Sequence, residues 1–352
     1  MRILILPRYE INGPSSRYRF FQYLPYLKEQ GWEITIKPLL GANYVKHLYE
    51  KAPFPLVEIV LGYFKRMFLL LRKGKYDIIW VEQEAFPWIP SFIEKPLIKS
   101  KTKLIADYDD AFFHRYDLHK FFLIRYILGK KIDMVMSIAN LVLAGNEYLS
   151  DRAKENNSQL IEIFPTVVDT NKFVSMGSPG KNYFTIGWIG SPSTKKYLFM
   201  IEEALKEIYN LGKAKITLVG AGDLKFKDFP TDNIDWDEQT EVEEISKFDV
   251  GIMPLVDGPF ERGKCGLKLI QYLSCGVPVI GSPVGVNNQI IQHGINGFKA
   301  DTVKDWTKYL RIMKEDSDLR KKMGIEGRKF IVLNYSLKHN SSKLISLFES
   351  II

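Results

Sequence analysis

One segment, residues 257–298, constrains the fold more than any other part of the chain. It reads DGPFERGKCGLKLIQYLSCGVPVIGSPVGVNNQIIQHGINGF. The pattern predicts a strand end, a basic glycine-containing loop, an amphipathic helix, a short buried strand and a second glycine-rich loop. Glycines let a backbone approach phosphate oxygens closely, and a helix start offers unpaired N–H groups and a positive dipole end. The segment therefore predicts a binding site for a diphosphate.

Two lysines add positive charge to this segment. Lys264 and Lys268 are four residues apart, so they share one helical face if the helix begins near Gly263. Gly276 and Pro278 are expected to end the helix, and residues 277–280 then form a short buried strand.

The segment resembles the donor-binding region of retaining GT-B glycosyltransferases of family 4. Many members carry EGFGLxxLEAMxxGxPVV and a GGxxE-type loop, which align here with GKCGLKLIQYLSCGVPVIGSPVGVNNQ. The family's two glutamates fall on Gly263 and Gln271, and the acid of its later loop falls on Gln289. Glu261 lies two residues before the first of these positions and takes the place of that glutamate only if the loop shifts. The RGKCGxK…Q form is similar to a sub-branch in which lysines replace part of the acidic pattern. The resemblance implies the GT-B fold, while the role of each carboxylate does not carry over.

Composition limits the class of protein and its partners. The chain has 352 residues with 46% hydrophobic and 26% charged residues, which is typical of a globular protein of two domains. A formal charge of +8 favours anionic partners, namely nucleotide sugars, anionic lipid or nucleic acid. Nucleic acid ranks last, because no zinc finger, recognition helix or aromatic RNA-binding motif is present.

The cysteines and the apolar runs indicate the cellular compartment. Cys265 and Cys275 are the only cysteines, so no disulfide framework or cysteine-rich metal site is predicted. The first residues lack a signal-peptide pattern, and no apolar run is long enough to span a bilayer. We expect a cytoplasmic protein, with peripheral contact to the cytoplasmic face of the inner membrane as a further hypothesis.

Strands and helices alternate along the chain, which predicts an α/β protein with parallel sheets. Strands are expected at 1–7, 32–38, 76–81, 103–106, 134–137 and 141–144, and then at 184–189, 215–219, 234–236 and 250–253. A Pro-, Ser- and Gly-rich break at 164–180 separates the halves, and FPTVVDTNKF within it resembles the family's interdomain segment. The resemblance implies two Rossmann-like doubly wound domains facing across a cleft, with 1–170 binding the acceptor and 171–336 the donor. The helix at 337–352 is expected to pack back on the first domain.

Further donor-binding residues come from two loops. GWIGSPSTKKYL at 187–198 is expected to end a strand and start a helix capped by Ser193 or Thr194. The resemblance puts Ser191 where the family has arginine and Lys196 where it has a diphosphate-binding lysine, so Lys264 or Lys268 would replace the missing charge. A surface lysine pair is the alternative. VGAGD at 219–223 lacks the third glycine of a dinucleotide-binding motif.

The resemblance assigns further donor contacts by position. They are Gly13, Gly190, Ser191, Gly220, Trp236, Gly266, Leu267, Gln271 and Gln289. Trp236 is expected to contact the base, although a core aromatic is an equal alternative. Gln271 can hold ribose hydroxyls but cannot act as a base. Gln289 lines the sugar or nucleotide side, with a structural turn as the alternative.

Two loops of the first domain are candidates for the acceptor side. NGPSSRYR at 12–19 resembles the family's glycine-rich loop. The resemblance brings the backbone N–H groups of 13–16 to the diphosphate or the acceptor and pairs Arg17 with an anion, and the alternative is a tight turn capped by Ser15. ADYDDAFFHRYD at 106–117 follows a strand end, where ligands bind in open α/β sheets. Asp110 is chosen there to orient an acceptor hydroxyl or take its proton, against helix capping as the alternative. No role is given to His114, no metal is expected, and 145–147 resembles the family's SE-type loop.

Two apolar and basic segments remain, PFPLVEIVLGYFKRMFLLLRKGK at 53–75 and residues 118–131. Helices of this kind lie in a membrane interface or face a core with basic side chains at the rim. Both interpretations stay open.

The resemblance implies a retaining hexosyltransferase that moves a sugar from a nucleotide sugar to the hydroxyl of a cell-surface polysaccharide or lipid-linked glycan. The nucleotide sugar is a co-substrate, and no cofactor is expected. Lys196, Lys264 and Lys268 would hold the leaving diphosphate, with front-face attack in place of a carboxylate nucleophile. The alternatives are a catalytically silent GT-B subunit that partners an active transferase and a nucleotide-sugar epimerase. Gly263 and Gln271 argue against the epimerase, because both family acids are missing.

Overall fold

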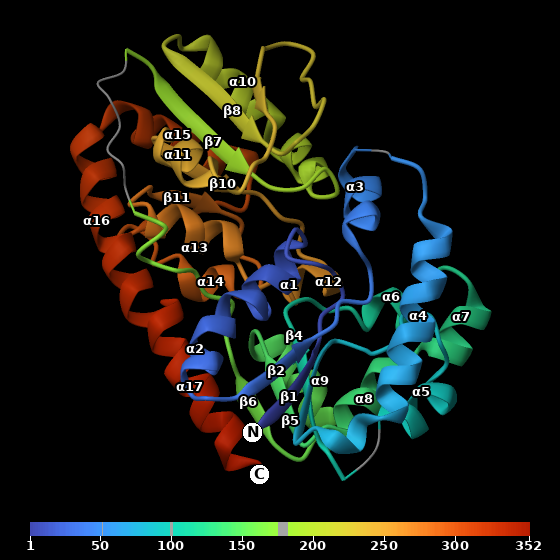
Figure 1. The fold of residues 1–352 in the computed structure, drawn as a ribbon. Coiled ribbons are helices and arrows are strands. Elements are labelled where there is room, and N and C mark those ends of the chain that lie inside the picture. The colour runs from blue at the N-terminus through green and yellow to red at the C-terminus, as the bar shows by residue number, and fades with distance from the viewer. Residues whose placement is uncertain (51, 99–100, 175–181) are drawn as a thin grey trace. The chain divides into compact units, whose positions relative to one another are not determined.

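The computed structural model describes residues 1–50, 52–98, 101–174 and 182–352, and Figure 1 traces them as a ribbon. The chain divides into two compact units. The first contains Met1–Thr166, Arg262–Cys265 and Asn340–Ile352, and the second contains Val167–Glu261 and Gly266–His339. The predicted interdomain break at 164–180 lies partly outside the described residues.

The first unit is built on a six-stranded parallel sheet of order β2-β1-β3-β4-β5-β6. Its strands are β1 (Arg2–Leu6), β2 (Glu33–Ile36), β3 (Ile78–Glu82), β4 (Lys103–Tyr108), β5 (Leu141–Ala144) and β6 (Ile161–Ile163). All five residues of β3 are buried, as expected for a central parallel strand covered on both faces.

Helices connect these strands. They are α1 (Pro14–Arg19), η1 (Phe21–Tyr23), α2 (Leu24–Glu29), α3 (Ala42–Glu50), α4 (Leu56–Leu71), η2 (Lys73–Lys75), α5 (Ser91–Ile98), α6 (His114–Asp117), α7 (Phe122–Leu128), α8 (Lys131–Ile138) and α9 (Glu147–Glu155). The last helix, α17 (Leu337–Ser350), packs on this unit as well: the Phe348 ring lies 5.1 Å from that of Trp80 and 6.3 Å from that of Trp32.

The second unit repeats the plan with a parallel sheet of order β12-β11-β10-β7-β8-β9. Its strands are β7 (Phe184–Ile189), β8 (Ala214–Val219), β9 (Asp232–Ile234), β10 (Val250–Met253), β11 (Val279–Gly281) and β12 (Gly297–Lys299). The remaining helices are η3 (Lys195–Ile201), α10 (Glu202–Asn210), α11 (Glu241–Ser246), α12 (Pro259–Arg262), α13 (Leu267–Ser274), α14 (Asn287–Ile290), α15 (Val303–Glu315) and α16 (Ser317–Asn334). Each unit is thus a parallel α/β domain, as the sequence predicts.

Two local predictions are wrong. Residues 134–137 belong to α8 rather than to a strand, because a four-residue apolar run does not distinguish the two, and buried Lys131 anchors this helix through ion pairs to Glu84 and Glu94. The helix after Gly263 begins only at Leu267, because Gly266 has φ +67°, a left-handed backbone that a helix does not continue through.

The described residues contain neither a membrane-spanning helix nor a cluster of metal ligands. None of the helices in these ranges is long and apolar enough to cross a bilayer. No group of three or more His, Cys, Asp or Glu side chains within the same ranges is arranged to hold a metal ion.

Candidate functional site

Lys268 lies at the carboxyl end of β7 in the second unit. Its ammonium is 4.4 Å from the centroid of the Trp188 ring and 3.3 Å from the Thr194 hydroxyl. Gly190 follows β7, and a Cβ added there would come within 2.8 Å of Lys268 Cε. The glycine therefore leaves the space that the lysine side chain occupies, and it brings Lys268 to the loop 190–194 where the sequence predicts the donor diphosphate.

The loop 190–194 is held by its own hydroxyls. Thr194 Oγ1 donates to the Ser191 carbonyl over 3.0 Å, and the Ser191 and Ser193 hydroxyls are 2.8 Å apart. Thr194 precedes η3, but its side chain does not cap that helix, so capping by Thr194 is a wrong prediction. Lys196 is exposed, and its ammonium lies 5.0 Å from the centroid of its neighbour Tyr197.

Gly220 lies in the turn after β8 and packs against the loop 190–194. It has φ +76°, and a Cβ there would collide with the Gly190 carbonyl and lie 3.2 Å from Trp236 Cβ. The positive φ and the close approach both require glycine at this position. Gly220, a donor contact that the resemblance implies, thus lies beside Gly190 and Trp236.

Trp236 and Gln271 converge on a buried carboxylate that sequence reasoning missed. Trp236 Nε1 donates to Glu241 Oε2 over 3.2 Å, and Gln271 Nε2 lies 3.5 Å from the same oxygen. The Glu241 side chain is 1% exposed and begins α11, where the helix dipole favours an acid. Glutamine at 271 is therefore compatible with this environment, since its amide can donate to Glu241, whereas a glutamate there would add a second buried negative charge.

Glu241 was missed because its sequence context is typical of an exposed helix. Residues 241–244 read EVEE, and such a run usually faces solvent. The one signal that could have indicated it is its position five residues after Trp236, at a helix start.

The start of α13 packs against residues 286–290, which include α14. A Cβ on Gly266 would lie 2.5 Å from Ile290 Cδ1 and 3.6 Å from Asn287 Oδ1. Asn287 Nδ2 donates to the Ser282 carbonyl over 3.0 Å, while its buried Oδ1 has no hydrogen-bond partner within the described ranges. Leu267 is half-buried as the first residue of α13, and Gln289 is exposed on α14.

In the first unit, Lys264 forms an ion pair with Asp110. Lys264 Nζ lies 3.5 Å from Asp110 Oδ1, and the two side chains are 17% and 27% exposed. Desolvation raises the pKa of Asp110 to about 6, and the Lys264 ammonium opposes that rise. Lys264 precedes α13, so it does not share a helical face with Lys268 as the sequence suggested.

Asn146 holds the segment that carries Lys264. Its amide Nδ2 donates to the carbonyls of Gly263 over 2.9 Å and Lys264 over 3.1 Å, and its Oδ1 caps α9. A Cβ on Gly263 would lie 2.6 Å from the backbone nitrogen of Ala111, so the glutamate of the resembled family does not fit here. Glu261 does not fill that role freely either, because it is buried and accepts a hydrogen bond from the Tyr197 hydroxyl.

The loop after β1 contacts acids at the ends of the neighbouring strands. Gly13 precedes α1, and a Cβ there would collide with Tyr9. Ser15 donates to Asp109 rather than capping α1, and Ser16 donates to Glu82 Oε2 over 2.6 Å. Arg17, the predicted anion contact, is buried with its guanidinium 5.1 Å from the Tyr18 ring.

The acids at and after the ends of β3 and β4 differ in burial and in their partners. Asp107 is buried and accepts from Arg19 Nε over 2.7 Å and Trp80 Nε1 over 3.1 Å, so it stabilises the fold. Burial raises the pKa of Glu82 to about 7 and that of Asp107 to about 6. His114 contacts Asp117 over 2.8 Å and the Tyr148 hydroxyl over 2.7 Å, which engages both ring nitrogens. Asp110 is left as the partly exposed acid beside a lysine.

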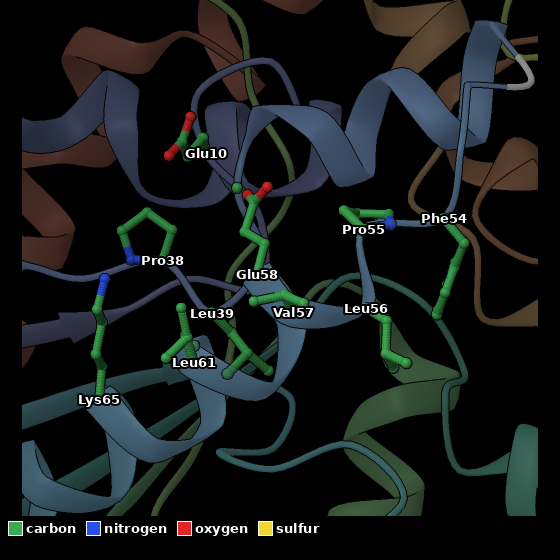
Figure 2. Close-up of a pocket in the computed structure, with 12 residues that line it drawn as sticks. Glu10, Pro38, Leu39, Phe54, Pro55, Leu56, Val57, Glu58, Leu61 and Lys65 are labelled. Atoms are coloured by element: carbon green, nitrogen blue, oxygen red, sulfur yellow. The ribbon is translucent and has the colours of Figure 1, made fainter.

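A groove that the sequence did not predict lies beside α4 in the first unit (Figure 2). Its volume is about 650 Å³. Leu39, Val57 and Leu61 make its apolar wall, and the carboxylates of Glu10 and Glu58 lie together at one end (Figure 2). Such a groove can take an apolar group that carries hydroxyls.

The second unit matches a known family. Residues 180–316 match the family model described as Glycosyl transferases group 1. This part of the chain is a group 1 glycosyltransferase domain. The match includes the loop 190–194, Gly220, Trp236 and the whole of α13.

The chain is also similar to two relatives, and its fold to that of a solved structure. N-acetyl-alpha-D-glucosaminyl L-malate synthase of Bacillus anthracis is 32% identical over 94 residues, which cover 26% of this chain and only 23% of that relative. An uncharacterized glycosyltransferase of Methanocaldococcus jannaschii is 22% identical over 85% of this chain and 84% of its own. Anabaena HepE, solved in complex with UDP-glucose, superposes with a TM-score of 0.75 at 14% identity, over 99% of this chain and all of that one. The chain therefore has the two-domain GT-B fold.

Proposed function

We propose that this glycosyltransferase moves a hexosyl group from a nucleotide sugar to an acceptor hydroxyl with retention of configuration. The observation that carries the proposal is Lys268, which Gly190 admits to the carboxyl end of β7 beside the loop 190–194. Ligands of open α/β sheets bind at this edge. A similar structure was solved with UDP-glucose, which supports a nucleotide-sugar donor.

The second unit holds the donor in this proposal. Lys268 binds the diphosphate together with the backbone of the loop 190–194, and exposed Lys196 adds charge from the following turn. Gln271 and Trp236, organised by Glu241, bind the nucleoside. Asn287 Oδ1, a buried acceptor beside the start of α13, suits a sugar or ribose hydroxyl. Gly266, Leu267 and Gln289 complete the donor contacts.

The chemistry follows from the charges available. The bond between the sugar's anomeric carbon and the phosphate oxygen breaks, and the acceptor oxygen bonds to that carbon from the same face. The departing diphosphate oxygen takes the acceptor proton, while Lys196, Lys264 and Lys268 offset the negative charge that develops. Asp110 orients the acceptor hydroxyl from the first unit. The enzyme then contributes positioning and charge stabilisation rather than a covalent intermediate.

The acceptor is proposed to be a cell-surface polysaccharide or a lipid-linked glycan. The groove beside α4 supports an acceptor with an apolar part, because its wall is aliphatic and Glu10 and Glu58 can accept hydrogen bonds from sugar hydroxyls.

A catalytically silent GT-B subunit is the second candidate, and Gly263 favours it. The backbone of Ala111 leaves no room for the carboxylate of the resembled family at this position. A silent subunit would bind a nucleotide sugar or a partner chain without turning over a sugar.

Proton NMR of the purified full chain with nucleotide sugars tests the proposal. A glycosyltransferase of this kind is expected to hydrolyse its donor slowly and release a sugar that first has the donor's anomeric configuration. Release of the opposite anomer contradicts retention, and an epimerised nucleotide sugar contradicts transfer. An unchanged donor that nevertheless binds supports the silent subunit.

A further inference from the structure

Helix α4 exposes an apolar stripe on its outer side. Val57, Phe64, Phe68 and Leu71 lie at helical spacing and are 73%, 53%, 61% and 64% exposed. The inner side is fastened by Arg66, whose guanidinium donates to the carbonyls of Pro7, Lys37 and Ala85 over 2.6, 2.9 and 3.2 Å. A helix of a soluble domain normally turns such a stripe toward the core, so this one is oriented for contact outside the unit.

Two neighbouring helices expose apolar side chains as well. Around α7, Phe121, Phe122, Leu123 and Tyr126 are 58%, 69%, 63% and 78% exposed. On α5, Phe92 is 72% exposed.

The three helices form one surface. The Tyr63 hydroxyl on α4 donates to the Pro87 carbonyl over 2.8 Å, in the loop that leads to α5. Trp88 in this loop packs its ring 5.2 Å from Tyr116 and 6.0 Å from His119, just before α7. Figure 1 draws α4, α5 and α7 beside one another. We call the exposed apolar residues of these helices and of Trp88 the apolar face.

The charged side chains that border the apolar face are basic. The exposed ones on α4, its C-cap, α5 and residues 118–130 are Lys65, Arg72, Lys95, Lys120, Arg125 and Lys130. The two acids of these stretches are withdrawn: Glu94 is buried against Lys131, and Glu58 is half-buried and accepts from Asn43 over 2.9 Å. Large exposed apolar patches mark interaction sites, and a positive border selects an anionic partner.

We propose that the apolar face seats this protein on the surface of an anionic bilayer. Aromatic and aliphatic side chains enter the interface, while the lysines and arginines extend to lipid phosphates. The six basic side chains act together, because each adds to the attraction of an anionic membrane. A second copy of this chain is a poorer occupant, because pairing two such faces would oppose one basic border to the other. The proposal does not rest on glycosyl transfer.

Co-sedimentation with lipid vesicles tests it on the full chain. We expect binding to vesicles of phosphatidylcholine mixed with phosphatidylglycerol, much weaker binding to phosphatidylcholine alone, and weakening by salt. The variant Phe64→Ser/Phe68→Ser and the variant Lys120→Gln/Lys130→Gln are each expected to lower the affinity about tenfold or more. Leu333→Ser, which changes a 72% exposed leucine on α16, is the matched control and should bind as the unchanged protein does.

Three outcomes would overturn the proposal. They are no vesicle binding, equal binding to neutral and anionic vesicles, and a concentration-dependent dimer in light scattering that Phe64→Ser/Phe68→Ser abolishes. Circular dichroism checks that each variant is folded. Donor binding, measured by calorimetry, should be the same in all of them, so a failure here is distinguishable from a failure of the proposed glycosyl transfer.

Discussion

The Lys264 ammonium lies 3.5 Å from Asp110 Oδ1, although the two residues are far apart in the sequence. Asn146 holds the segment of this pair from a third part of the chain, since its side-chain amide donates to the carbonyls of Gly263 and Lys264. The pair joins the acid chosen for the acceptor with a lysine chosen for the diphosphate, so it gives the proposed reaction a pH dependence.

The rate of sugar transfer is expected to fall on the acid side as Asp110 becomes protonated near pH 6. Because the Lys264 ammonium lowers the pKa of Asp110, Lys264→Met should move this limb to higher pH. Initial rates across the neutral and mildly acidic range measure the shift. Asp110→Asn should be slow and lack the limb, and an acid limb that stays in place in Lys264→Met would contradict the pairing.

Glu82 should make the protein less stable as pH rises. Burial raises its pKa to about 7 from an ordinary value of 4.5, so between those values the folded state binds more protons than the unfolded state. The contribution of Glu82 to the free energy of unfolding is therefore complete below about pH 4. Up to about 3 kcal/mol of this contribution is lost as pH rises through about 7. Urea unfolding at several pH values should show that Glu82→Gln reduces this loss.

Asp77 supplies the control for that measurement. Hydrogen bonding from the Arg2 backbone lowers its pKa, so its contribution is present above its unfolded pKa and is lost as pH falls. Asp77→Asn should leave the decline toward alkaline pH intact. A decline of equal size in the unchanged protein and Glu82→Gln would show that Glu82 is not its source.

Gln271→Glu is expected to destabilise the second unit, because it places a carboxylate beside buried Glu241. A loss of about 1–3 kcal/mol in urea unfolding above neutral pH is the expected cost of an unpaired buried charge. Adding Glu241→Gln should recover most of it, since the amide and acid have then exchanged places. If the double variant loses as much as the two single variants together, the two side chains do not interact.

The sequence predicted most strands of this protein, because buried apolar runs alternate with helical patterns along the chain. β5, β7 and β10 begin and end where the pattern placed them. β6 and β12 were not predicted, because each has three residues and depends on pairing with its neighbour. Residues 134–137 were assigned to a strand although Lys131 fastens them in a helix.

The candidate site was predictable in part. Gly190 and Lys268 follow from motif spacing, because glycine and lysine have distinct roles near phosphate. Glu241 did not follow, since its contacts with Trp236 and Gln271 arise only when α11 and α13 meet. The position of Lys264 was not predicted either, because it depends on the left-handed backbone of Gly266 and on the hydrogen bonds of Asn146.

The most direct test of donor binding is calorimetric titration of the full chain with UDP-, GDP-, ADP- and dTDP-sugars. We expect that one nucleotide sugar binds and that Lys268→Ala weakens its binding at least about tenfold through loss of a charge-assisted contact. Lys321→Ala, which changes an exposed lysine on α16, should bind as the unchanged protein does. Equal affinity in Lys268→Ala, or no binding of any of these sugars by folded protein, would contradict donor binding at Lys268.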